Sequence, residues 1–185
     1  KSGNTLLADT LESIRQVVIG KSDNSLTRIY EEYEEKRNEE FIKVLRELIE
    51  AAKTKFSFDE ACNFYEKLIA IERSPGNLFS YAHLLHSLND FTKAKQYYEE
   101  ILVTYRALAT KNPQAYNPDL ASTLNNLGLL LSNNNEIKQA KDCYQEALDI
   151  RRDLAKKNPQ AYNPDLAGTL NTISWSNTAI SSLRS

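Results

Sequence analysis

The sequence of 185 residues has few of the residues that interrupt helices, form disulfide frameworks or cross membranes. It contains only 5 Gly, 5 Pro and 2 Cys, so it favours helix and gives no indication of a disulfide scaffold. Its longest apolar runs, such as 127–131, fall far short of the ~20 residues of a membrane span. The first residues also lack the basic start and apolar stretch of a secretory signal. We therefore expect no contact with a membrane and a cytoplasmic location.

The sequence also lacks an excess of charge of either sign. Lys and Arg together number 23 and Asp and Glu number 25, which gives a net charge of -2. A protein without a basic field has little to attract the phosphate backbone of a nucleic acid. We expect no nucleic-acid partner.

Motifs that carry chemistry are missing as well. There is no glycine-rich phosphate loop, no G-x-S-x-G and no H-E-x-x-H. His83 and His86 lie three residues apart on one predicted helix, but no third metal ligand accompanies them at helical spacing. Cys62 and Cys143 have no evident activating base, so we interpret them as packing residues. The acidic run 31–35 is typical of a solvated helix face. The sequence predicts no catalytic residue, metal site or cofactor, and hence no enzyme.

What the sequence does contain is a repeat. Residues 106–121 and residues 152–167 are identical at 14 of 16 positions, and the second copy follows the first by 46 residues. Self-similarity at a period of about 20–50 residues is typical of stacked repeat architectures. The fold is therefore expected to be a row of similar units.

The segment between the two copies contains two amphipathic helices. In the first, Leu120, Leu124, Leu127 and Leu131 recur at three- and four-residue spacings and so share one face. We expect this helix to begin at 117–118, with the Asn as N-cap and the Pro at the first helical position. The Asn run at 133–135 ends it, and a second apolar stripe runs from residue 137 to 154 before the next Asn-Pro pair. The unit is a helical hairpin.

Small residues occupy the places where the two helices of such a hairpin meet. Gly128 and Ala140 are short enough for the helix axes to approach to about 8 Å, and Tyr144 follows one turn later. In this pattern the sequence resembles the tetratricopeptide-repeat family. The phrases beginning at Phe58, Phe91 and Ile137 align by their alanines, which are separated by 33 and then 46 residues. The expected packing positions of this kind are Ala61, Ala82, Ala94, Gly128, Ala140 and Ala147.

The longer unit, with its Pro-Asp-Leu-Ala start, is similar to repeats of kinesin light chains and of many bacterial repeat proteins, and predicts longer paired helices. The resemblance implies an all-α fold, a right-handed α-solenoid of antiparallel helix pairs. The expected segments are flanking helices at 1–36, a degenerate helix pair at 37–74, a unit at 75–111, a long unit at 112–157, and residues 158–185. This last segment is either a unit cut short or a C-terminal capping helix.

The resemblance also implies a concave groove lined by the first helix of each unit. Peptide-binding members of the family hold ligand main chain with an Asn at the place of Asn126, and an amide can both donate and accept hydrogen bonds. The candidate groove residues are Phe79, His83, Ser122, Asn125, Asn126, Asn171 and Trp175. The alternative is that these asparagines only satisfy helix ends or solvent.

A basic clamp for chaperone C-termini is not expected, because the matching places hold Phe79, His83, Asn126, Gly168 and Thr172. The leading functional hypothesis is a scaffold module that binds a protein or peptide. A second hypothesis is a self-associating structural arm, a homo-oligomer. A third is the regulatory part of an enzyme whose catalytic domain lies outside this chain. Repeat folds host many partners, so the partner itself is not predicted.

Overall fold

The computed structural model describes the backbone of residues 24–182 and the side chains of residues 35–174. The first part of the flanking segment expected at 1–36, residues 1–23, lies outside this range. Every element within it is a helix: α2 (Asn24–Thr54), α3 (Phe58–Ile71), α4 (Pro75–Ser87), α5 (Phe91–Lys111), α6 (Pro113–Asn133), α7 (Ile137–Lys157) and α8 (Pro159–Ser182). The all-α prediction is confirmed.

The chain divides into two compact units between Ile71 and Glu72. In the first unit, α2 packs on α3, and its core includes Leu45, Ile49 and Tyr65. Ala52 lies on the same buried face of α2 as Leu45 and Ile49, at four- and three-residue spacings, whereas Leu48 is 39% exposed. Helix α2 runs without a break through the expected boundary at 36–37.

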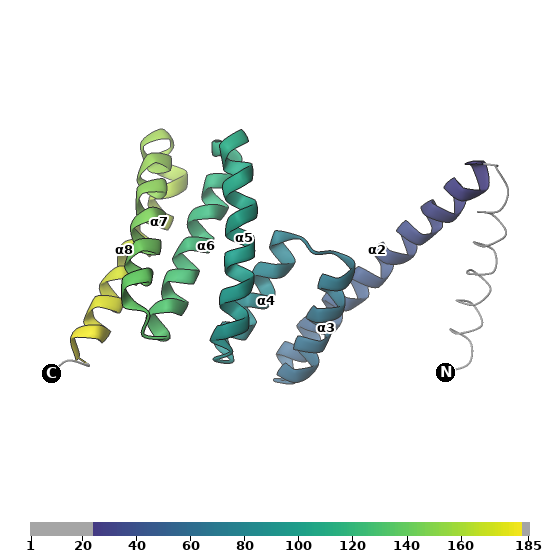
Figure 1. Cartoon of the computed structure of the whole chain (residues 1–185), viewed down its shortest axis with the longest axis horizontal. Coiled ribbons are helices and arrows are strands. Elements are labelled where there is room, and N and C mark those ends of the chain that lie inside the picture. Colours follow the sequence, from purple (N-terminus) through teal and green to yellow (C-terminus); the bar gives the residue numbers. More distant parts are fainter. Residues whose placement is uncertain (1–23, 183–185) are drawn as a thin grey trace. The chain divides into compact units, whose positions relative to one another are not determined.

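The second unit contains α4 to α8, and each helix packs against the next along the chain. Figure 1 shows α5, α6, α7 and α8 as neighbouring, roughly antiparallel helices. Helix α6 contacts α4 and α8 as well as α5 and α7. This arrangement of hairpins, in which first helices also contact first helices, is an α-solenoid.

The turn inside each hairpin is the same structure three times. Its central residue has a positive φ, at Phe56 (58°), Asn89 (63°) and Asn135 (62°). These positions are separated by 33 and 46 residues, as are the aligned alanines. In each turn the next N–H donates to the carbonyl five residues earlier, which caps the preceding helix in a Schellman arrangement. The three bonds are Ser57 to Ala52 (2.9 Å), Asp90 to Leu85 (2.9 Å) and Glu136 to Leu131 (2.7 Å).

The 46-residue period is accommodated by longer helices, as predicted. Helices α5, α6 and α7 have 21 residues each, whereas α4 has 13. The expected start at 117–118 is wrong, however. Helix α6 begins at Pro113, and Pro118 lies inside it.

Asn112 and Pro113 can serve as N-cap and first helical residue in the same way as the Asn-Pro pair at 117–118. They lie about one and a half helical turns earlier in the chain, and the helix starts there. The side-chain oxygen of Asn112 accepts from the Ala115 N–H at 3.2 Å. Pro118 then removes only one helical hydrogen bond near the helix start. Helix α8 repeats this, since Asn158 accepts from Ala161 at 3.2 Å and Pro164 lies inside the helix.

The small residues lie in the core of their units. Five alanines expected at packing positions (Ala61, Ala82, Ala94, Ala140 and Ala147) and Gly128 are all buried. A Cβ on Gly128 would lie 2.8 Å from two ring carbons of Tyr144. The Tyr144 ring of α7 therefore lies directly against the backbone of α6, which explains the glycine at position 128.

Candidate functional site

A recess of about 530 Å³ opens in the second unit between the first helices of two consecutive hairpins. Helix α4 contributes Gly76, Phe79 and Ser80 to its lining, and α5 contributes Tyr105. The other lining residues come from α6 and α7: Asp119, Ser122, Thr123, Asn126 and Arg151. The α6 residues are spaced by three and four positions, so they lie on one face of the helix.

Arg151 is the most deeply placed charge of the recess, since only 8% of it is exposed. One of its terminal nitrogens donates to the main-chain oxygen of Asp165 at 2.9 Å and to the hydroxyl of Thr169. The other donates to the hydroxyl of Ser122 at 3.2 Å. The guanidinium thus joins α6, α7 and α8.

All three of these acceptors are neutral. The described carboxylates make no ion pair with Arg151. Burial lowers the pKa of the guanidinium, and the charge of Asp165 opposes that shift. Because arginine stays protonated in proteins, the recess keeps a positive charge at its floor.

The rest of the lining is aromatic and polar. The ring of Phe79 makes an edge contact with Tyr98, with centroids 5.7 Å apart. Burial, together with the nearby Asp119 carboxylate, raises the pKa of Tyr105, so its hydroxyl is a neutral donor. Asn126 donates to the main-chain oxygen of Ser122 at 2.9 Å. This uses one amide hydrogen of Asn126 and leaves its oxygen as an acceptor.

Three of the predicted groove residues, Phe79, Ser122 and Asn126, line this recess together. His83 is exposed on α4 and outside the lining. Asn125 is half-buried, and its side-chain oxygen is buried without a hydrogen-bond partner among the described residues. Asn171 is exposed on α8. Trp175 belongs to α8, but its side chain lies outside the described residues.

Arg151 and Tyr105 were missed by sequence reasoning, although the repeat itself could have found them. The two residues are 46 positions apart, as are Ser80 and Asn126, and Gly76 and Ser122. The recess is therefore built from repeat-equivalent positions of two units. Arg151 was overlooked because it stands next to Arg152, and the sequence alone does not distinguish a buried arginine from a solvent-exposed one.

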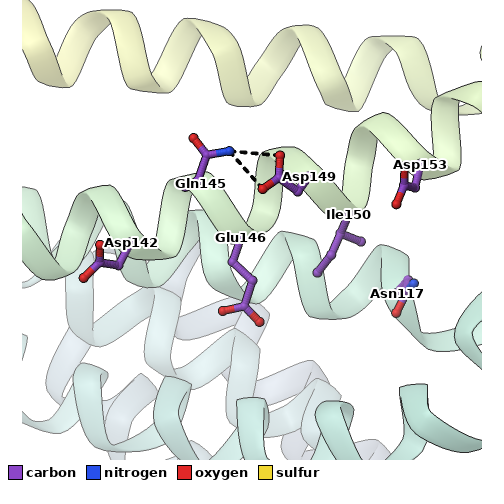
Figure 2. A pocket seen from close by; sticks show the side chains of 7 residues that line it. All are labelled: Asn117, Asp142, Gln145, Glu146, Asp149, Ile150 and Asp153. Carbon is purple, nitrogen blue, oxygen red and sulfur yellow. Dashed lines mark hydrogen bonds between the residues drawn. The ribbon is translucent and has the colours of Figure 1, made fainter.

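A second recess, of about 480 Å³, lies along α7 and carries four acidic residues. Figure 2 shows the amide of Gln145 directed at the carboxylate of Asp149, with Glu146 pointing away from both. Glu146 pairs with Arg106 at 2.7 Å and Asp153 pairs with Lys156 at 2.8 Å. With Asp149 also paired to Arg152 at 3.4 Å, three of the four carboxylates have a cation of the chain as partner, so this recess is a weaker candidate than the first.

The residues considered for chemistry are not part of the lining of either recess. His86 is half-buried, and its Nε2 lies 3.0 Å from the amide nitrogen of Asn133. Burial lowers the His86 pKa, and the charge of His83 adds to this effect. Burial raises the pKa of Cys143 to about 11, which keeps it a thiol at neutral pH. Among the described residues, no three His, Cys, Asp or Glu side chains gather as metal ligands.

The fold and the recess together define a class: helical hairpins stacked in a solenoid, with a polar hollow between consecutive first helices. Residues 78–153, which extend from α4 into α7, match the family model described as tetratricopeptide repeat. This segment of the chain is a tetratricopeptide-repeat segment.

Among curated proteins, none matches the sequence significantly. A solved structure named MamA RS-1 ArsTM double mutant aligns with 77% of this chain and 97% of its own length, at 15% identity and a TM-score of 0.32. An overlap of that size supports no conclusion about the partner or the site. Across the described residues, no helix has both the length and the apolar character needed to span a bilayer.

Proposed function

We propose that this chain is a protein–protein interaction module that holds a peptide or helix of a partner protein in the recess between α4 and α6. The observation that carries the proposal is that Phe79, Ser122 and Asn126, from first helices of two consecutive repeats, line one hollow. A surface made of repeat-equivalent positions runs along the array and suits a ligand that is itself extended.

The chemistry of the lining favours binding over catalysis. Its members are two aromatic rings, hydroxyls, one amide, one carboxylate and one guanidinium, with no His, Cys or Lys. The aromatic rings offer apolar area, and the amide and hydroxyls can pair with main-chain groups of any sequence. We therefore propose that no reaction takes place here. Kinesin-light-chain likeness, bacterial origin and a cytoplasmic location stay predictions.

The test is selection of binders from a random 12-residue peptide library displayed on phage, followed by fluorescence anisotropy with the best synthetic peptide. Asn126→Ala and Ser80→Trp should each weaken binding at least about fivefold, since a lost polar contact or a recess filled by an uncharged ring removes ~1 kcal/mol or more. Asn163→Ala is the matched control, because Asn163 is exposed on α8, lies outside the recess and is not a candidate groove residue. If no peptide is selected, or if the three variants bind alike, the recess is not the binding site.

A second candidate, self-association through α8, has one observation in its favour. Leu170 on α8 is 46% exposed, whereas Leu124, 46 residues earlier on α6, is 1% exposed. An exposed leucine at a position that is buried in the preceding repeat offers an apolar surface against which another helix can pack. Light scattering over a hundredfold range of concentration separates the two proposals, because a constant monomer mass excludes self-association.

A further inference from the structure

We propose that the recess binds the carboxylate of an acidic side chain, Asp or Glu, in the partner peptide, and that Arg151 is the residue that pairs with it. This inference rests on the proposed function and adds the chemistry of the partner.

Arg151 is buried and its hydrogen-bond partners are all neutral, while the charge of Asp165 acts on the guanidinium without forming an ion pair with it. Its contacts are a main-chain oxygen and the hydroxyls of Thr169 and Ser122. Buried charges in proteins are usually paired with an opposite charge, because desolvation is otherwise uncompensated. A guanidinium forms its strongest hydrogen bonds with a carboxylate, which accepts two parallel N–H groups. A carboxylate bound in the recess would give the Arg151 guanidinium a directly bonded negative partner.

The start of α4 adds to the positive potential of the same hollow. Gly76 lies in the first turn of this 13-residue helix and lines the recess. First-turn amides have no acceptor within their own helix, and the helix dipole is positive at this end. The hydroxyl of Ser74 accepts from the N–H of Asn77 at 3.3 Å, and the N–H of Gly76 has no acceptor among the described residues. Both Arg151 and the α4 terminus thus favour an anion.

Asp119 limits how many acidic groups can bind. Its exposed carboxylate belongs to the same lining and raises the pKa of Tyr105, so it lies near that ring. A carboxylate at the Tyr105 side would be repelled, whereas a main-chain N–H or a cation would be attracted. The preceding repeat also has Tyr105 where this one has Arg151. We therefore expect one acidic residue per bound peptide rather than an acidic run.

The experiment uses the full chain and the selected 12-residue peptide, amidated at its C-terminus so that only side-chain carboxylates remain. Each Asp or Glu of the peptide is replaced by Asn or Gln, and affinity for the wild-type chain is measured by anisotropy. We expect one such replacement to weaken binding about tenfold or more, as for a charge-assisted hydrogen bond. This arm does not depend on the folding of any variant.

The protein arm compares Arg151→Gln with Arg152→Gln, an exposed neighbour that pairs with Asp149 at 3.4 Å. Arg151→Gln should weaken the acidic peptide about tenfold and leave its neutral isostere unchanged, so that the two losses are not additive. Arg152→Gln should have no effect. Circular dichroism establishes that each variant is folded.

The outcomes separate this inference from the proposed function. If peptides bind and Asn126→Ala weakens them, but every acidic residue can be neutralised without loss, the proposed function stands and the role of Arg151 is wrong. If only a peptide with a free C-terminus binds, the group recognised is the terminal carboxylate, and the side-chain assignment is likewise overturned. If no peptide binds, both proposals fail.

Discussion

The ring of Tyr144 lies so close to the backbone of Gly128 that a methyl group there would come within 2.8 Å of two ring carbons. Tyr144 is buried, so the ring has little room to withdraw. This contact joins α6 to α7, and it explains why a residue that weakens helices occurs in the middle of α6.

Gly128→Ala should therefore destabilise the chain even though Ala favours helix. Ala is better than Gly by about 1 kcal/mol in a helix, but overpacking typically costs about 1–3 kcal/mol. We expect the free energy of unfolding to fall by about 1 kcal/mol, measured by urea denaturation.

Gly168→Ala is the matched control for this substitution. Gly168 lies inside α8, and a Cβ there would meet no atom within 4 Å. The control should gain up to about 1 kcal/mol. Equal stabilisation by both substitutions would show that the close approach of Tyr144 is not a constraint.

Phe56→Asn should stabilise the hairpin of α2 and α3. Phe56 has a φ of 58° and is exposed, whereas the equivalent turn positions hold Asn89 and Asn135. A left-handed conformation costs a bulky residue about 1 kcal/mol, and Asn tolerates it better. Thermal unfolding followed by circular dichroism should show a higher midpoint.

The reverse substitution, Asn89→Phe, tests the same relationship in the next turn. It should lower the midpoint, because the turn geometry is the same and only the residue changes. Opposite shifts are required by the explanation. If both substitutions lowered the unfolding midpoint, the edge contact between Phe56 and Phe58, with centroids 6.0 Å apart, would outweigh the backbone strain at Phe56.

Cys143 should be a slow thiol in the folded chain. Burial raises its pKa from 9.0 to about 11, so the thiolate fraction at pH 8 falls about 100-fold. Reaction with a disulfide reagent at pH 8 should be correspondingly slower in buffer than in urea, measured in a Cys62→Ser background. Since the folded pKa is the higher one, the stability contributed is present below pH 9 and lost as pH rises through about 11. Equal rates in buffer and urea would contradict this.

The repeat register was predictable from the sequence because its physical cause is local. Close packing of helices requires Ala or Gly where the helices touch. Ala61, Ala94 and Ala140 are such residues, and each follows its turn at the same spacing in the sequence. Helix starts were less predictable, because Asn112-Pro113 and the Asn-Pro pair at 117–118 carry the same capping chemistry. Only the packing of the long helices distinguishes them.

The candidate site was predictable in part, for a related reason. Residues on the free face of α6, Ser122 and Asn126, follow from the period of that helix. Arg151 comes from the second helix of the hairpin and reaches the recess only through its long side chain. Its partners Asp165 and Thr169 lie on α8, 46 residues after Asp119 and Thr123, so the repeat period points to them, but their contact with Arg151 depends on the packing of α7 against α8.

The central claim is that the hollow between α4 and α6 holds a partner peptide, and its most direct test is amide chemical-shift mapping of the full chain with the selected 12-residue peptide. The account predicts that the largest shifts occur at Gly76, Ser80, Ser122 and Asn126, the lining contributed by α4 and α6. Largest shifts instead along the acidic face of α7, near Asp142 and Asp149, or on the exposed side of α8 would contradict it.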